Sequence, residues 1–383
     1  MDPLALYIHW PFCLAKCPYC DFNSHVRERI PQARFRDALR TELAWEAQRL
    51  GRRRLGSVFF GGGTPSLMEP DTVGLLLRDA FRLFDPVPDI EITLEANPTS
   101  VEIRRLAGFR EAGVNRASLG VQSLDAAALA MLGRQHSAGQ AIEALEAARR
   151  VFPRISFDLI YARPGQDLAA WRAELNAALA LVADHLSLYQ LTIEPGTKFE
   201  TLHRRGEIVL PDDDAAAALY EATVEEAARH GLRPYEISNY AVPGGESRHN
   251  LAYWRYTDYA GIGPGAHGRV TVGGALVATR RHRAPEPWAD RVERDGHGTV
   301  EETALAPEER AREMLLMGLR LTEGIDIARF QPRTGMKLED AIDLDTLLAA
   351  EAEGYLMHRD GRLMATAEGR MRLDALLGRL VRS

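Results

Sequence analysis

The sequence has very little cysteine. Its 383 residues include three, Cys13, Cys17 and Cys20, and all of them lie within eight positions. An odd number of cysteines cannot pair completely in disulfides, so this set indicates thiolate ligands rather than cross-links. Three thiolates are one short of a closed tetrahedral metal site, and the pattern therefore predicts an open coordination position.

Features of several other protein classes are also missing. The chain has no excess of positive charge, because 47 Lys and Arg stand against 54 Asp and Glu for a net charge of −7. This balance argues against a nucleic-acid partner. The sequence has neither an apolar run long enough to span a bilayer nor the pattern of a signal peptide. Because thiols stay reduced in the cytoplasm, we expect a cytoplasmic protein.

Short apolar runs alternate with amphipathic stretches over the first half of the chain. Strands are expected at 4–9, 57–60, 91–96, 116–121, 154–160 and 185–191, with helices at 31–50, 71–83, 101–112, 138–151 and 168–181. This order predicts a parallel sheet with helical crossovers, and the continuously apolar strands indicate burial on both faces. We therefore expect an α/β fold, either a partial TIM-like barrel of about six β/α units or a closed barrel of eight.

The pattern changes beyond residue 200, and we expect three parts: a core barrel over 1–200, an extension over 201–305 and a C-terminal domain over 306–383. The last part combines expected helices at 307–321 and 344–353 with a final helix that runs to 381. A turn at Asp360-Gly361 between two short apolar runs predicts a hairpin. These elements predict a small winged-helix-like domain.

The residues of the cysteine loop leave three interpretations open. The loop could hold zinc with His9 or His25 as fourth ligand, form a redox-active thiol pair, or hold a [4Fe–4S] cluster with one free iron. The loop follows the first strand, at the end where parallel α/β folds place their sites. The Cys-x3-Cys-x2-Cys spacing favours the cluster.

The cysteine loop, with Tyr19 before its last cysteine, resembles the signature of the radical S-adenosylmethionine (SAM) superfamily. In that superfamily three cysteines hold a [4Fe–4S] cluster and SAM chelates the fourth iron. The run Phe-Gly-Gly-Gly-Thr-Pro, which follows the second expected strand, resembles the glycine-rich element that binds the SAM amino group. A glycine run lets the backbone approach a ligand closely. The resemblance therefore implies that Gly62, Gly63 and Thr64 contact SAM.

Polar residues also occur at or just past the ends of later strands. Buried polar groups on parallel strands need partners, so these residues predict a lined pocket. They match positions that contact SAM in the oxygen-independent coproporphyrinogen dehydrogenase branch of the superfamily, and an aromatic residue of the first strand matches the one that packs on SAM. With Tyr19, the residues that the resemblance assigns to SAM are Tyr7, Glu95, Gln122, Arg134 and Asp158.

The string His-Asn-x-x-Tyr-Trp, which begins at His249, resembles a marker of the HemW-type haem chaperones. It implies haem as a cargo and His249 as a ligand of its iron. Histidine is the commonest axial ligand of haem, and tyrosine and tryptophan offer flat surfaces to a porphyrin. From the residues alone, a structural histidine in a tight loop is the simpler interpretation. His267, in Gly-Ile-Gly-Pro-Gly-Ala-His-Gly, is a second candidate ligand.

Phe22 separates the two branches of this resemblance. The dehydrogenase branch usually has a fourth cysteine at this position, two residues after the third. The phenylalanine and the His-Asn-x-x-Tyr-Trp string favour the haem-chaperone family, which the chain resembles over nearly all its length. One departure is Arg163, which adds a charge near the expected SAM face.

The resemblance implies a protein that binds haem and passes it to apo-haemoproteins, among them membrane respiratory enzymes. We expect a monomer or homodimer that is cytoplasmic and lies at the membrane surface when it delivers haem. The alternative is a coproporphyrinogen III dehydrogenase, which oxidatively decarboxylates its substrate. The sequence leaves open whether the protein is an enzyme.

Overall fold

The computed structural model describes residues 2–382, so Met1 and Ser383, at the outer ends of two expected domains, lie outside the described residues. The six expected strands are neighbours in one sheet: β1 (Leu4–Trp10), β4 (Arg54–Gly62), β5 (Asp85–Ala96), β6 (Arg116–Gln122), β7 (Arg154–Tyr161) and β8 (His185–Gln190). All six run parallel, as predicted. Their carboxyl ends therefore meet at one edge.

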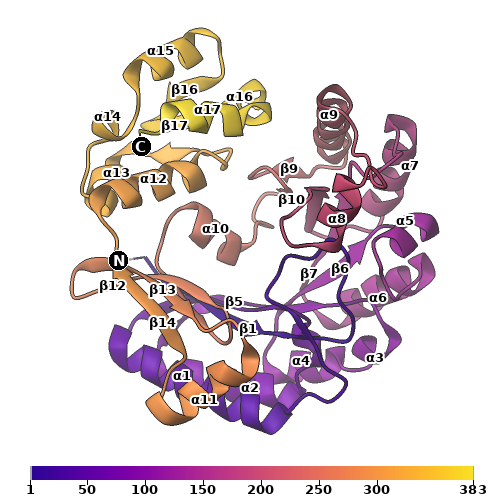
Figure 1. The fold of residues 1–383 in the computed structure, drawn as a ribbon, viewed down its shortest axis with the longest axis vertical. Helices are drawn as coiled ribbons and strands as arrows, with labels where there is room; N and C mark the ends of the chain where they lie inside the picture. Colours follow the sequence, from indigo (N-terminus) through magenta and orange to yellow (C-terminus); the bar gives the residue numbers. More distant parts are fainter. Residues whose placement is uncertain (1, 383) are drawn as a thin grey trace.

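Helices cover the outer face of this sheet (Figure 1): α1 (Gln32–Leu50), α2 (Pro70–Leu83), α3 (Ser100–Ile103), α4 (Leu106–Ala112), α5 (Ala126–Met131), α6 (Ala138–Val151) and α7 (Leu168–Leu179). Local sequence sets several of the helix starts. Helix α2 has a proline at its first position, and α6 begins with a capping box between Ser137 and Gln140. The single helix expected over 101–112 is interrupted, and forms α3 and α4 instead.

The sheet continues past β1 with strands that the sequence analysis did not predict. Strand β11 (Tyr259–Ile262) lies parallel to β1, followed by antiparallel β12 (His267–Val272), β13 (Ala275–Arg281) and β14 (Thr299–Ala304). At the other side, β8 is followed by β10 (Asn239–Ala241) and β9 (Arg233–Pro234). Within the described residues the sheet ends at β14 and β9, so the partial barrel is open. Of the two barrels expected, the open one is confirmed.

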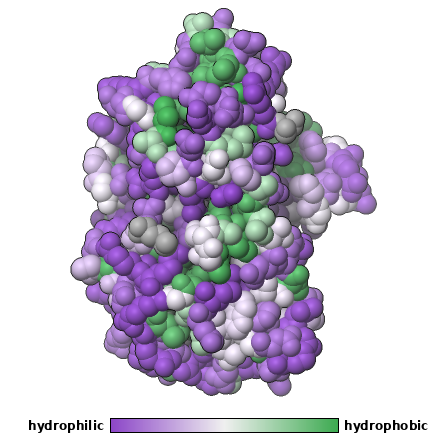
Figure 2. All heavy atoms as spheres, turned by 90° about the vertical axis from the view of Figure 1, so that its left-hand side faces the viewer, coloured by the Kyte–Doolittle hydropathy of each residue, from purple (hydrophilic) through white to green (hydrophobic). Residues whose placement is uncertain are grey.

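The C-terminal part is built around a small sheet in the order β15 (Ile325–Asp326), β17 (Arg362–Ala365), β16 (Leu356–Arg359), and its core also includes Tyr256 and Leu276 from the preceding part of the chain. The predicted hairpin turn lies at Asp360 and Gly361, whose φ angles of 51° and 73° fit a tight turn. The helices here are α12 (Pro307–Gly318), α13 (Ile327–Thr334), α14 (Leu338–Ala341), α15 (Leu344–Ala352), α16 (Ala367–Met371) and α17 (Leu373–Leu380). Figure 2 shows hydrophobic surface at the end of the molecule that α15 forms.

No helix within residues 2–382 has the length and apolar character needed to cross a bilayer.

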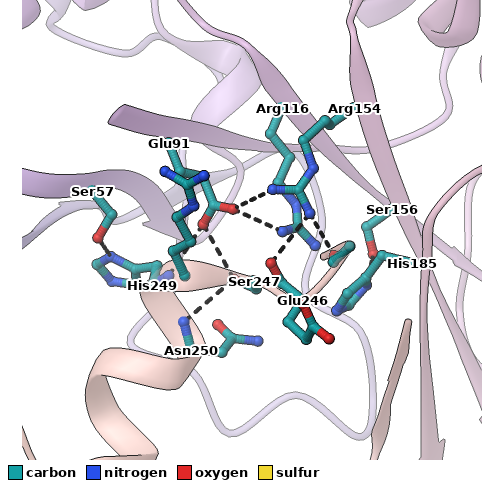
Figure 3. Close-up of polar contacts among 12 residues, drawn as sticks. Ser57, Glu91, Arg116, Arg154, Ser156, His185, Glu246, Ser247, His249 and Asn250 are labelled. Atoms are coloured by element: carbon teal, nitrogen blue, oxygen red, sulfur yellow. Dashed lines mark hydrogen bonds and ion pairs between the residues drawn. The ribbon is translucent and has the colours of Figure 1, made fainter. Parts of the chain in front are cut away.

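Helix α10 (Arg248–Trp254), which carries the His-Asn-x-x-Tyr-Trp string, lies on the concave side of the sheet against β4 (Figure 1). A buried carboxylate attaches its first turn to the sheet (Figure 3). Glu91 of β5 accepts a hydrogen bond from the amide of His249 at 3.1 Å and forms ion pairs with Arg116 and Arg154 at 3.0 Å each. Burial alone would raise the pKa of Glu91, but these partners hold it below its ordinary value of 4.5.

Replacing Glu91 with alanine is expected to destabilise the fold by about 3–5 kcal/mol, because it leaves the buried Arg116 without its counter-charge. The Glu91 carboxylate stabilises the fold above pH 4.5, and this contribution is lost as the pH falls below that value. Denaturant unfolding at pH 7 measures the loss. The matched control is Glu301→Ala, whose exposed pair with Arg280 contributes at most about 1 kcal/mol. Equal unfolding midpoints for the two variants would contradict this account of α10.

Candidate functional site

A cavity of about 460 Å³ lies at the carboxyl ends of the parallel strands, under the cysteine loop. It is lined by nearly all the residues that the sequence analysis singled out, namely Cys13, Cys17, Tyr19, Cys20, Gly62, Gly63, Thr64, Glu95, Gln122, Arg134 and Asp158. Of the residues assigned to SAM or haem, Tyr7 and His249 do not line it, and neither do the other candidate ligands, His9, His25 and His267. We call this the cluster cavity.

The glycine run packs directly under the cysteine loop. The amides of Gly63 and Thr64 donate to the carbonyls of Trp10 and Phe12 at 2.7 and 2.8 Å, which joins the end of β4 to the start of the loop. A Cβ at Gly63 would lie 2.7 Å from the Phe12 carbonyl oxygen. At Gly62, where φ is 116°, it would lie 2.5 Å from the His9 ring. Both positions therefore require glycine for close packing.

Each thiol has a polar neighbour. Thr64 Oγ1 donates to Cys13 Sγ at 3.3 Å, Arg134 Nη1 donates to Cys17 Sγ at 3.4 Å, and Cys20 Sγ lies 3.8 Å from Ser24 Oγ. Burial raises the pKa of both Cys13 and Cys20, so their thiolates need a positively charged partner. The iron of a cluster supplies such a charge.

A chain of hydrogen bonds holds Arg134 against the cavity wall. Arg134 Nη2 donates to Asn97 Oδ1 at 2.6 Å and to the Gly120 carbonyl at 2.7 Å, and Asn97 Nδ2 donates to Thr64 Oγ1 at 3.2 Å. The Nε of Arg134 is buried, and no residue in 2–382 accepts a hydrogen bond from it. An unpaired guanidinium donor in the wall of a cavity fits an anionic ligand group such as a carboxylate.

Two carboxyl groups lie on the floor of the cluster cavity. Burial, and next the nearby Asp158, raise the pKa of Glu95 to about 8, while burial raises the pKa of Asp158 to about 6. One Glu95 oxygen accepts from the Gly62 amide at 3.1 Å. Two acids whose charged forms are disfavoured by burial fit a cationic ligand, which would stabilise those charged forms.

Tyr7 lines a second cavity, of about 530 Å³, which shares Gly62, Glu95 and Phe22 with the cluster cavity. The Tyr7 hydroxyl is hydrogen-bonded to His9 Nδ1 at 2.9 Å, and His9 Nε2 is hydrogen-bonded to the Asn23 carbonyl at 2.9 Å. A carbonyl can only accept, so Nε2 carries the proton and Nδ1 accepts from the tyrosine. Both nitrogens of His9 are thus engaged, which argues against it as a zinc ligand.

His249 lies behind the wall of this second cavity. It is 1% exposed, its Nδ1 lies 2.9 Å from Ser57 Oγ, and its Nε2 lies 3.0 Å from the hydroxyl of Tyr253, which lines the cavity. Burial lowers the pKa of His249 to about 3, so the imidazole is neutral. The structure brings His249 close to a cavity but not into one, and ligation by it would need Tyr253 to move.

The sequence analysis missed several residues of the cluster cavity. Asn97 directly follows β5, and Tyr189 lies near the end of β8, so the rule that found Glu95 could have found both. Ser118, within β6, carries no such signal. Arg163, the departure from the family that adds a charge near the expected SAM face, is 6% exposed and forms an ion pair with Glu174. Its charge is therefore neutralised within the fold.

The cluster cavity fits the groups that the sequence predicted for it. The three cysteines, the unpaired Nε of Arg134 and the buried acids match a cluster together with a ligand that carries both carboxylate and positive charge. In the described part of the chain, no three His, Cys, Asp or Glu side chains converge tightly enough to hold a single metal ion. The thiols are thus not arranged around one zinc, whose sulfur ligands lie about 2.3 Å from the metal.

Two family models match the chain: the Radical SAM superfamily over residues 7–177 and the HemN C-terminal domain over residues 305–372. The relative named radical S-adenosyl methionine domain-containing protein 1, mitochondrial, from Bos taurus is 41% identical over 97% of this chain and 86% of its own. The heme chaperone HemW of Escherichia coli is 38% identical over 98% of each chain. That of Bacillus subtilis is 34% identical, also over 98% of each.

Among solved structures, the coproporphyrinogen III oxidase HemN of Escherichia coli, described as a radical SAM enzyme, superimposes with a TM-score of 0.81. The match covers 98% of this chain and 89% of that chain at 22% identity, and it shows a shared fold. The relatives above 30% identity span nearly the whole sequence. The chain therefore belongs to the HemW family of radical SAM proteins.

Proposed function

We propose that the protein is a haem chaperone, which binds haem and passes it to apo-haemoproteins in the cytoplasm. The observation that carries this proposal is the similarity, over nearly the whole chain, to proteins named heme chaperone HemW. Phe22 supports it, because it stands where the dehydrogenase branch has a further cysteine. The acceptors would include respiratory enzymes at the membrane, and the chaperone would work as a monomer or homodimer without a nucleic-acid partner.

We further propose that Cys13, Cys17 and Cys20 hold a [4Fe–4S] cluster and that the cluster cavity binds SAM. When bound, these groups supply one-electron chemistry. The chain itself would bind and orient SAM. Arg134 Nε is free to donate to its carboxylate, and Glu95, once ionised, can accept from its amino group. Tyr19, Gln122 and Asp158, with the backbone of the glycine run, would complete the walls.

The second candidate function is that of a coproporphyrinogen III dehydrogenase, which the shared fold with HemN favours. Anaerobic reconstitution with iron and sulfide, followed by two parallel assays, separates the two functions. One assay adds SAM, a reductant and coproporphyrinogen III, and the other titrates haemin by absorbance. The chaperone predicts stoichiometric haem binding without decarboxylation. Protoporphyrinogen with release of deoxyadenosine would make the protein an enzyme instead.

His249→Ala is expected to weaken haem binding by about tenfold or more, which is about 1.4 kcal/mol, while leaving the cluster in place. The affinity would fall either because the variant lacks an iron ligand or because Tyr253, which lines the second cavity, loses its hydrogen bond to His249. The matched control is His185→Ala, because His185 is also buried between a serine and a tyrosine hydroxyl, those of Ser156 and Tyr235. An unchanged haemin titration in the His249 variant would exclude His249 from haem binding.

A further inference from the structure

The second cavity is not accounted for by the cluster and SAM. Its wall brings together Tyr7 of β1, Tyr253 of α10, Tyr259 of β11, His267 of β12 and Arg280 of β13. Strand β1 is distant in sequence from the other four elements, which follow one another along the chain, and Figure 1 shows β1, α10, β12 and β13 in one region of the fold. A volume of about 530 Å³ lies in the range of small-molecule sites, so the cavity can hold a ligand of cofactor size.

The inner wall of this cavity is aromatic. The rings of Tyr253 and Tyr259 lie 4.4 Å apart at 74°, and Tyr7 lines the cavity beside them. Phe22 lines the mouth of the cavity and is 61% exposed, so an apolar ring faces solvent there without a packing partner. Aromatic walls of this kind favour a large planar ligand.

The mouth is positively charged. Arg280 and Arg283 are both exposed and both line the cavity. Arg283 forms no ion pair with any residue in 2–382, and Arg280 pairs with Glu301 at 2.7 Å, where both side chains are about half exposed. Such an exposed pair contributes at most about 1 kcal/mol, so a carboxylate ligand can compete for the guanidinium. Two available guanidiniums fit a ligand with two carboxylates.

Among the histidines around this cavity, His267 differs from the others. Both ring nitrogens of His9 are hydrogen-bonded, and so are both of His249 behind the wall. His267 is exposed at the mouth, and within the described residues neither of its ring nitrogens has a hydrogen-bond partner. An imidazole can ligate iron only through a free lone pair, and His267 offers one without any rearrangement.

We propose that this second cavity is the haem site, in which Arg280 and Arg283 pair with the two propionates and His267 ligates the iron. This inference rests on the proposed haem-chaperone function and assigns that function a site. The planar ring would lie against the tyrosine wall, with Phe22 at the mouth. Because Gly62, Glu95 and Phe22 belong to both cavities, haem would lie directly beside the ligand of the cluster cavity.

The test titrates the reconstituted full-length protein with three probes: haemin, haemin dimethyl ester and metal-free protoporphyrin IX. The Arg280→Ala/Arg283→Ala double variant is expected to weaken haemin binding about tenfold and to leave the ester, which lacks free propionates, unchanged. His267→Ala is expected to weaken haemin binding and shift its Soret band, but not to change binding of the metal-free porphyrin. Arg294→Ala and His358→Ala, which change exposed residues elsewhere, are the matched controls.

The outcomes separate this inference from the proposed function. If the unmodified protein binds no haemin, the chaperone proposal itself fails. If it binds haemin but the arginine and His267 variants titrate as the controls do, haem binds elsewhere and this site is wrong. A loss confined to haemin with free propionates, together with a Soret shift in the His267 variant, would establish the site. Because His267, Arg280 and Arg283 are exposed, replacing them is not expected to disturb folding, and the iron–sulfur spectrum of each variant checks that it has folded.

Discussion

Cys17→Ala is expected to abolish the [4Fe–4S] cluster, because a cluster with three protein ligands has no spare thiolate to replace a lost one. Cys17 is half-buried, and its Sγ accepts a hydrogen bond from Arg134 at 3.4 Å, so alanine removes a ligand at little cost to packing. Absorbance and electron paramagnetic resonance of the anaerobically reconstituted protein measure the cluster. We expect iron content and the broad visible absorbance to fall to background.

The control for this variant is Ser24→Ala, which removes the hydroxyl 3.8 Å from Cys20 Sγ but leaves all three thiols in place. It is expected to reconstitute as the unmodified protein does. An intact iron–sulfur spectrum in Cys17→Ala would overturn the assignment of the three cysteines as ligands.

The affinity for SAM is expected to rise with pH up to about pH 8, by as much as tenfold per pH unit. Burial and the nearby Asp158 raise the pKa of Glu95 to about 8, so at neutral pH its carboxyl is mostly protonated. SAM carries a positively charged sulfonium group, which stabilises the ionised form of Glu95. Binding must therefore release a proton below pH 8, and this proton cost falls as the pH rises.

Isothermal titration calorimetry in buffers of different ionisation enthalpy measures both the affinity and the proton release. Glu95→Gln is expected to bind SAM more weakly at pH 8 and to lose the pH dependence. Glu194→Gln, in the wall of the same cavity, is the matched control and should keep the dependence. A slope that persists in the Glu95 variant would assign the proton to another group.

The raised pKa of Glu95 has a second consequence, in the protein without SAM. The group holds a proton in the folded state between its ordinary value of 4.5 and about 8, but not in the unfolded state. Folding takes up a proton in this window, so stability decreases as the pH rises through it. Glu95→Gln should remove the decrease between about pH 6 and pH 8, which denaturant unfolding at several pH values measures. Below pH 6 Asp158, whose pKa burial raises to about 6, still contributes.

The parallel half of the fold was predictable because its signals are local. Continuous apolar strands and amphipathic helices alternate there, and the six expected strands match β1 and β4–β8. Strands β11–β14 were missed because β11 is short and runs into a glycine-rich segment, residues 261–268, which interrupts the strand pattern before β12. The pair Gly273-Gly274, with φ angles of 57° and 86°, is a hairpin turn between two β-branched runs and was an available signal.

The cluster cavity was predictable because its residues follow strand ends, which parallel topology brings together. Their arrangement was not. The hydrogen bonds that join Arg134, Asn97 and Thr64 link three separate loops, and spacing along the chain carries no information on them. The burial of His249 and the second cavity depend on where α10 and β11–β13 pack, so the sequence could not place them.

The central claim is that this chain delivers haem, and a transfer measurement tests it most directly. The protein is loaded with haemin and separated from free haemin. It is then mixed either with an apo-respiratory enzyme as the acceptor or with apomyoglobin, which only scavenges haem that has been released. A chaperone predicts that the acceptor gains haem faster than the scavenger does, because transfer proceeds through a complex. Equal rates, set by spontaneous release of haem, would contradict the account.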